Sequence, residues 1–149
     1  MFGRLRRILG GREEASRHSR HEERFGLSTL APEERERIGT EHDPLRGYEA
    51  AVERHHQAME ADRRGNPDTT IRLYEESVAE GFVGSHPYEA LASLHERRRN
   101  HQDALRVTES YIQLARSGAM PRGAQRSADR KLPDFKARAT RYQRLLDEN

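Results

Sequence analysis

Residues Ser85 to Ala115 read SHPYEALASLHERRRNHQDALRVTESYIQLA and predict two antiparallel helices joined by a short polar turn at Asn100–Gln102. On the first helix, residues at i, i+3, i+4 and i+7 share one face, namely Tyr88, Leu91, Ala92 and His95. The second helix presents a matching face made of Ala104, Leu105, Val107, Thr108, Tyr111 and Ile112. Ala92 and Ala104 lie where the helices would cross, and their small side chains allow a close approach of the two axes. We expect this hairpin to form the centre of the fold.

The same pattern occurs earlier in the chain. Thr70 precedes Ala104 by 34 residues, and the segment TIRLYEESV (Thr70–Val78) aligns with ALRVTESYI (Ala104–Ile112). An aromatic residue near the start of the first helix, Leu-Ala three and four residues later, and an Ala opening the second helix resemble a tetratricopeptide repeat, whose period is 34 residues. The resemblance covers roughly Leu45 to Ala115, about half of the chain.

The first helix of the earlier repeat matches less well. Arg54 stands at the position that Tyr88 occupies in the later repeat, although Ala58 does align with Ala92. We interpret the pattern as one good repeat and one degenerate repeat. The alternative is an unrelated helical bundle with a coincident period.

The sequence therefore predicts an all-α fold, with about two tetratricopeptide-like helical hairpins and a closing helix in residues 44–149. The first helix would begin at Asp43 or Pro44, and the second would run from Pro67 to Glu80. Two side chains are expected to cap helix starts, Asn66 and Ser85. The closing helix is predicted over Pro133–Asp147, after a polar linker. Such a helix shields the open end of a repeat stack.

Residues 1–43 are predicted to lie outside this domain. The segment Met1–Arg12 (MFGRLRRILGGR) lacks acidic residues, and as a helix it would separate its arginines from an apolar face of Phe2, Leu5, Ile8 and Leu9. It could contact an anionic membrane surface peripherally or dock on a partner; the alternative is a frayed start. It has no continuous apolar core of a secretory signal. Residues Glu13–Asp43 read as a largely disordered linker with one short helix at Ala31–Ile38.

Composition narrows the class of protein. Of 149 residues, 33% are hydrophobic and 35% are charged, which is typical of thin helical layers with much exposed surface. The absence of cysteine excludes disulfides, thiolate nucleophiles and iron–sulfur clusters and fits a cytoplasmic location. No apolar run is long enough to span a membrane. The preference for arginine over lysine indicates a GC-rich bacterial genome.

Motifs of catalytic chemistry are not found. The sequence has no glycine-rich phosphate loop, no G-x-S-x-G turn and no H-E-x-x-H zinc signature. His56 and Glu60 are four residues apart, but two ligands do not make a metal site, and His55 lies on the apolar stripe of its helix. We therefore expect a non-enzymatic protein without a cofactor or metal.

The resemblance also implies a binding surface. In this family the inner face of each first helix lines a concave groove, and the corresponding positions here are His55, Met59, Asp62, Arg63, His86, Glu89, Ser93, Glu96 and Arg97. Family members that bind a C-terminal carboxylate use lysine and asparagine at several of these positions, and this chain does not. The resemblance thus implies an adaptor that binds a mixed-charge peptide or a helix of a protein partner. A homodimer would be a second way to complete so short a groove.

The alternative function is association with nucleic acid through the basic region Arg116–Arg144. This region contains nine basic residues, opposed by Asp129 and Asp134. Its aromatic residues fall on one stripe with Ala139 and Leu146, namely Phe135 and Tyr142. That stripe favours a structural helix whose aromatics face inward and whose arginines, including Arg138 and Arg141, lie on the solvent side.

Overall fold

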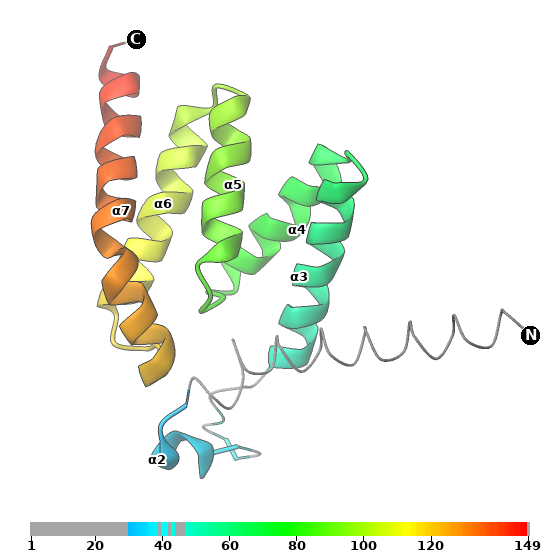
Figure 1. Cartoon of the computed structure of the whole chain (residues 1–149), viewed down its shortest axis with the longest axis vertical. Coiled ribbons are helices and arrows are strands. Elements are labelled where there is room, and N and C mark those ends of the chain that lie inside the picture. The colour runs from blue at the N-terminus through cyan, green and yellow to red at the C-terminus, as the bar shows by residue number, and fades with distance from the viewer. Residues whose placement is uncertain (1–29, 39, 42, 44–46, 149) are drawn as a thin grey trace, which may run out of the picture.

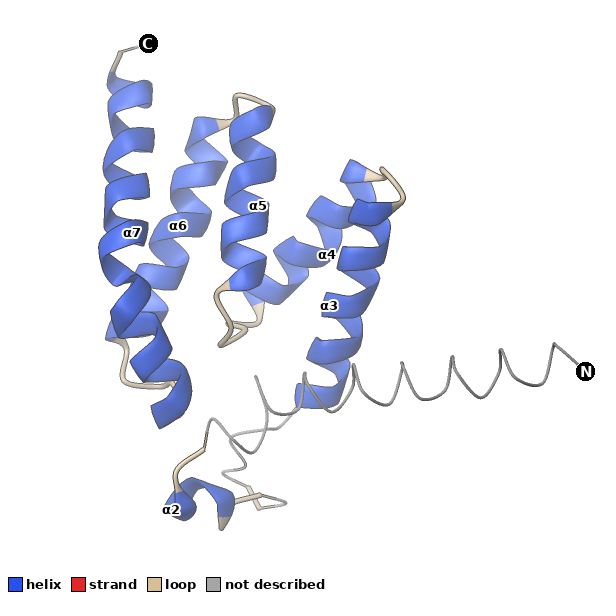
Figure 2. Ribbon diagram, viewed as in Figure 1, coloured by secondary structure: helices blue, strands red, loops and turns tan. Residues whose placement is uncertain are grey.

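The computed structural model describes residues 30–38, 40, 41, 43 and 47–148. Within these residues the protein is all-helical and contains no strand (Figures 1 and 2). The prediction of an all-α chain is therefore confirmed for the described part. The Met1–Arg12 segment and the first part of the predicted linker lie outside the described residues.

Five long helices follow one another and form the body of the molecule. They are α3 (Tyr48–Arg63), α4 (Pro67–Ala79), α5 (His86–Arg97), α6 (His101–Arg116) and α7 (Arg122–Asp147). Each of these helices packs mainly against the next one in the chain, so that α3 and α7 lie at opposite sides of the row (Figure 1). Helix α3 begins at Tyr48, later than predicted, and the backbone of Gly47 before it is left-handed, with φ of 75°.

The α3–α4 and α5–α6 turns have the same backbone geometry. Gly65 and Arg99 both adopt a left-handed conformation, with φ of 73° and 56°. In each turn an asparagine follows and accepts a hydrogen bond from the backbone three residues on: Asn66 from Thr69 N at 3.3 Å, and Asn100 from Asp103 N at 3.2 Å. The two turns are 34 residues apart in the sequence. The predicted cap at Asn66 is confirmed.

The core forms where the predicted apolar faces meet. Ala92 and Ala104 are both 0% exposed, as the close crossing of α5 and α6 requires. Tyr88 and Tyr111 pack beside them with ring centroids 5.0 Å apart, and Phe135 of α7 lies 4.3 Å from the Tyr111 ring. The inward orientation of the α7 aromatics is therefore confirmed.

The loop between α4 and α5 is held by a buried aromatic side chain. Phe82 is 7% exposed, and its carbonyl accepts a hydrogen bond from the Tyr88 hydroxyl at 2.8 Å. Ser85, by contrast, makes no capping hydrogen bond at the start of α5. Ser85 is the N-cap residue of α5, as predicted, but its backbone is already helical (φ −76°, ψ −23°), and its hydroxyl accepts a hydrogen bond from Lys131 Nζ of α7 at 2.6 Å.

Helix α7 is much longer than predicted. A polar linker was expected up to Leu132, but the helix is continuous from Arg122 and contains Pro133 in its interior. The additional turns are held by Ala124 and Ala128, which are 7% and 0% exposed. These small residues lie four apart on one face, so the helix backbone packs closely on the core without large apolar side chains.

A short helix before the main body, α2 (Pro32–Arg35), contacts the start of α7. Glu34 Oε1 accepts a hydrogen bond from the Arg122 backbone N at 3.2 Å, and Glu33 pairs with the Arg122 guanidinium at 2.9 Å. Leu30 and Ala31 are 5% and 8% exposed. This short helix was predicted within a largely disordered linker, and in the structure it contacts the helical body.

Candidate functional site

A broad cavity lies along α3 and α4 and reaches the first residue of α5. Its volume is about 1180 Å³. Leu73 and Tyr74 provide buried apolar wall, and polar side chains of both helices surround them, including Glu53, His56, Gln57, Glu60, Thr69 and Arg72. Met59 lies in the same lining and is 44% exposed. The cavity thus combines an accessible apolar side chain with charges of both signs.

The structure brings four of the nine predicted groove residues together in this cavity. They are Met59, Asp62, Arg63 and His86. Arg63 forms an ion pair with Glu60 on the same helix. The cavity also includes side chains of α4, which the family resemblance did not assign to the groove. Nothing in the α4 sequence distinguishes the polar ones, Thr69 and Arg72, from ordinary solvent-facing positions.

His55 does not face the open cavity. It is 3% exposed, and its ring stacks on Phe82 with centroids 5.9 Å apart and lies edge-on to His86 at 5.0 Å. The Tyr74 hydroxyl lies 3.3 Å from His86 Nε2. Burial, with a smaller contribution from the charge of Asp62, raises the pKa of Tyr74 to about 12. His55 therefore supports the cavity wall from beneath.

Three other predicted groove residues lie against α7 and are not part of the cavity. Their contacts are Lys131 with Glu89 at 3.5 Å, Arg138 with Ser93 at 2.9 Å, and Arg141 with Glu96 at 2.6 Å. These three side chains thus contact α7 and do not line the cavity. Arg97, the ninth residue, is exposed in the last turn of α5 and has no ion pair with a described residue.

The same contacts correct the expectation for one residue of the basic face of α7, Arg138. Arg138 and Arg141 were expected on the solvent side of the closing helix. Arg141 is exposed as expected, at 52%, and pairs with Glu96. Arg138 is half-buried instead and donates hydrogen bonds to Ser93 Oγ and to the Tyr142 hydroxyl. The helical stripe predicted the inward side of α7, but the length of an arginine side chain lets flanking positions reach α5 as well.

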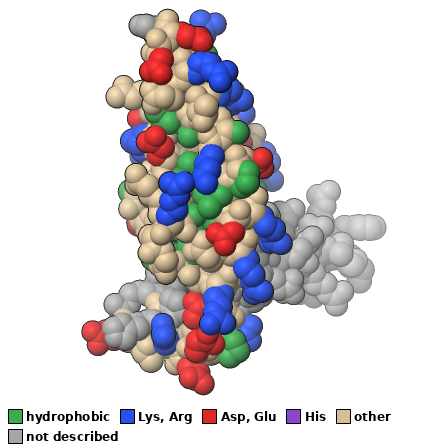
Figure 3. All heavy atoms as spheres, turned by 90° about the vertical axis from the view of Figure 1, so that its left-hand side faces the viewer, with side chains coloured by type: hydrophobic (Ala, Val, Ile, Leu, Met, Phe, Trp, Pro, Cys, Tyr) green, Lys and Arg blue, Asp and Glu red, His purple; other side chains and the backbone are tan. Residues whose placement is uncertain are grey.

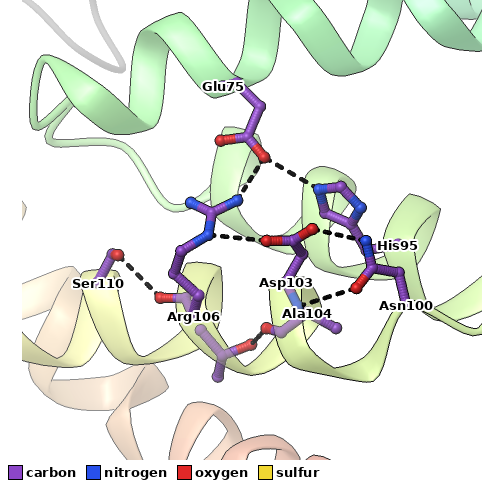
Figure 4. A network of polar contacts seen from close by, with 8 residues as sticks. Glu75, His95, Asn100, Asp103, Ala104, Arg106 and Ser110 are labelled. Carbon is purple, nitrogen blue, oxygen red and sulfur yellow. Dashed lines mark hydrogen bonds and ion pairs between the residues drawn. The ribbon is translucent and has the colours of Figure 1, made fainter.

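A polar network that the sequence did not predict joins α4, α5 and α6 (Figure 4). Glu75 Oε1 lies 3.0 Å from His95 Nε2 and accepts a hydrogen bond from Arg106 at 2.6 Å, and Arg106 also donates to Asp103 at 3.0 Å. Burial opposes ionisation of Asp103, but hydrogen bonds from Arg106 and Asn100 outweigh it and lower the pKa of the carboxyl. Asp103 and Arg106 are three residues apart on one helix, a spacing that the sequence shows. The pairing of Arg106 with Glu75 of another helix could not be predicted from the sequence.

The network joins side chains of α4, α5 and α6 and so helps to hold these three helices together. Among the residues that the structure describes, no three histidine, aspartate or glutamate side chains are grouped so that they could hold a metal ion. The described helices also include none whose length and apolar character would allow it to cross a membrane.

Comparisons with protein-family models, with curated proteins and with solved structures find no match to this chain.

Proposed function

We propose that the protein is a non-enzymatic interaction module that binds a peptide or helix of another protein at the α3–α4 cavity. The observation that carries this proposal is the exposed Met59 side chain within a cavity whose wall is otherwise packed and polar. An unbranched, polarizable side chain adapts to different apolar partners. An accessible apolar residue surrounded by charges is also the usual composition of an interface centre and its rim.

The proposal includes a tetratricopeptide-like arrangement, with α3–α4 and α5–α6 as two hairpins and α7 as the closing helix. The two turns that share their backbone geometry at the family's period of 34 residues support it. So does the burial of Ala58 and Ala92, which are 1% and 0% exposed at equivalent positions. A shared local geometry at a fixed period is the expected signature of a repeated unit.

The chemistry of the cavity narrows the partner. The lining contains the acids Glu53, Glu60 and Asp62 and the bases Arg63, Arg64 and Arg72, so neither sign of charge dominates it. We propose a ligand that presents one apolar side chain to Met59, flanked by charges of both signs. The proposal places the protein in the cytoplasm. Two further points stay predictions: contact of Met1–Arg12 with a membrane, and formation of a homodimer.

A matched pair of variants tests this function. Met59 and Ile38 are both exposed apolar residues, at 44% and 39%, but Ile38 is not in the cavity lining. Partners captured from the native host by the full-length protein would be identified, and their binding segments titrated as synthetic peptides. We expect Met59→Asp to weaken binding at least tenfold, because it removes an apolar contact and places a charge in the interface centre.

Ile38→Asp should bind like the unsubstituted protein, because that position lies outside the cavity. Equal affinities of the Met59→Asp variant and the unsubstituted protein would contradict the proposal. Circular dichroism of both variants would show whether the helical body is intact, as expected for exposed positions.

A further inference from the structure

Helix α7 carries a strong excess of positive charge. It contains eight basic and three acidic residues, whereas the whole chain has a net charge of only +2. The structure divides the basic residues into two groups: those that already have a partner within the protein, and those that have no ion pair with a described residue.

The first group is used to hold α7 in place. Lys131, Arg138 and Arg141 contact the side of α5, and Arg122 pairs with Glu33 of α2. Each of these side chains already has a hydrogen-bonding or charged partner within the protein, so binding a further anion would compete with that contact.

The second group consists of Arg126, Arg130, Lys136 and Arg144. All four are exposed, and none of them forms an ion pair with a described residue. From Arg126 to Arg144 the helix axis advances about 27 Å at the α-helical rise. Figure 3, which faces α7, shows basic side chains spread along this side of the molecule, with acidic side chains between them.

The residues between these cations leave room for a ligand to approach. Pro133, Ala137 and Thr140 fall on the same side of the helix as Arg126 and Arg144 when the sequence is projected at 100° per residue, and all three are exposed. Their side chains are small. Three carboxylates flank this face in the same projection, Asp129, Asp134 and Asp147, and two of them accept hydrogen bonds on α7 itself, Asp129 from Gln125 at 2.8 Å and Asp147 from Gln143 at 3.0 Å.

We infer that this outer face of α7 binds the phosphate backbone of duplex nucleic acid without reading its sequence. Arginine is suited to phosphate because its planar guanidinium can donate two parallel hydrogen bonds. A duplex offers a regular row of phosphates over a length such as 27 Å, at about one charge per 1.7 Å of axis.

Two observations favour a duplex over other polyanions. Phe135 and Tyr142 are 1% and 0% exposed, so they offer no surface on which unpaired bases could stack, as single-strand binding requires. The described part of α7 also has no exposed large apolar residue that could insert into a lipid surface. The inference does not depend on the peptide-binding proposal, since it concerns a different face of the molecule.

The test is a titration of the full-length protein with a 20-base-pair DNA duplex at several salt concentrations. Four phosphate contacts predict a slope of about −3.6 in a plot of log K against log salt. Replacing two of the cations, in the variant Arg126→Gln/Arg130→Gln, should halve that slope and weaken binding about 60-fold at 100 mM salt. Both residues are exposed, so circular dichroism should show an unchanged helical content.

A control variant removes the same charge elsewhere. Arg63 and Arg64 have side chains that are 70% and 76% exposed at the far end of α3, and Arg63→Gln/Arg64→Gln should keep the full slope. An equal loss of duplex affinity in both variants would overturn the inference, because it would show that binding depends on the net charge of the protein alone. Absence of duplex binding at 50 mM salt would also overturn it.

Two further probes distinguish the source of the phosphate. Tighter binding of a single strand of the same length would contradict the choice of a duplex. Binding of vesicles that contain anionic lipid, lost in Arg126→Gln/Arg130→Gln, with no binding of the duplex, would assign the face to a membrane surface and overturn the inference.

Discussion

A left-handed backbone conformation is required at one residue in each of the two similar turns. Gly65 and Arg99 adopt it, with φ of 73° and 56°. Glycine has no Cβ and enters this region at little cost, whereas other residues suffer a clash between Cβ and the backbone. The α3–α4 turn therefore has a residue suited to this conformation, Gly65, whereas the α5–α6 turn has one that is not, Arg99.

At this scale we predict that Arg99→Gly stabilises the protein by about 1 kcal/mol, because it relieves the left-handed strain at an exposed position. Gly65→Ala should destabilise it by a similar amount. Urea unfolding followed by circular dichroism measures both changes. Arg97→Gly is the control, because this residue is helical and the substitution should cost about 1 kcal/mol. A destabilised Arg99→Gly variant would contradict the prediction.

At the scale of the helices, the first turn of α7 is capped by side chains of another helix, α2. Its N-cap residue is Pro121, which makes no side-chain capping hydrogen bond. Glu34 of α2 supplies an acceptor for the Arg122 backbone N, and Glu33 adds a second carboxylate near the positive end of the helix dipole. Helix α2 thus caps α7 from a distance of 88 residues in sequence.

We predict that Glu33→Ala/Glu34→Ala loosens the first turns of α7, because the helix loses its only side-chain cap among the described residues. Amide exchange should become faster at residues 122–126, while the turns around Tyr142 stay protected. The expected loss of stability is about 1 kcal/mol. Glu36→Ala removes an exposed carboxylate from the same segment and should leave exchange in α7 unchanged. Equal exchange rates in both variants would show that α2 does not cap α7.

For the molecule as a whole, three tyrosines of the core link folding to pH. Burial raises the pKa of Tyr74 and of Tyr111 to about 12 and raises that of Tyr88 further. A raised pKa in the folded state means that folding favours the neutral phenol. The resulting stability is complete below the ordinary value of 10.0 and is lost as pH rises through the folded-state values.

We therefore predict that the protein unfolds in alkaline solution between about pH 10 and pH 12. Tyrosinate absorbance and the loss of helical circular dichroism should appear together over this range. Tyr88→Phe removes one of the titrating groups, and it also removes the hydrogen bond to the Phe82 carbonyl. The alkaline loss of stability of this variant is therefore measured relative to the stability of the same variant at neutral pH. Tyrosinate formation that is complete while the helices are intact would contradict this linkage.

Much of the helical framework could be predicted from the sequence. The faces around Ala92 and Ala104, the cap at Asn66 and the inward stripe of Phe135 and Tyr142 depend on residues a few positions apart, and such patterns follow from the helical period alone. For the same reason, the 34-residue offset between Thr70–Val78 and Ala104–Ile112 could be read before any contact was known.

The contacts between segments that are distant in the sequence are seen only in the tertiary structure. Contacts with α7 engage three of the nine predicted groove residues, namely Glu89, Ser93 and Glu96. The contact of α2 with Arg122 makes part of the predicted linker belong to the helical body. The partners of these charged residues could not be predicted from the sequence. An arginine that forms an ion pair and one that is exposed to solvent occur in the same local sequence pattern. The length of α7 was missed for a related reason: Ala124 and Ala128 are stabilised by packing on a core that exists only after α5 and α6 have assembled.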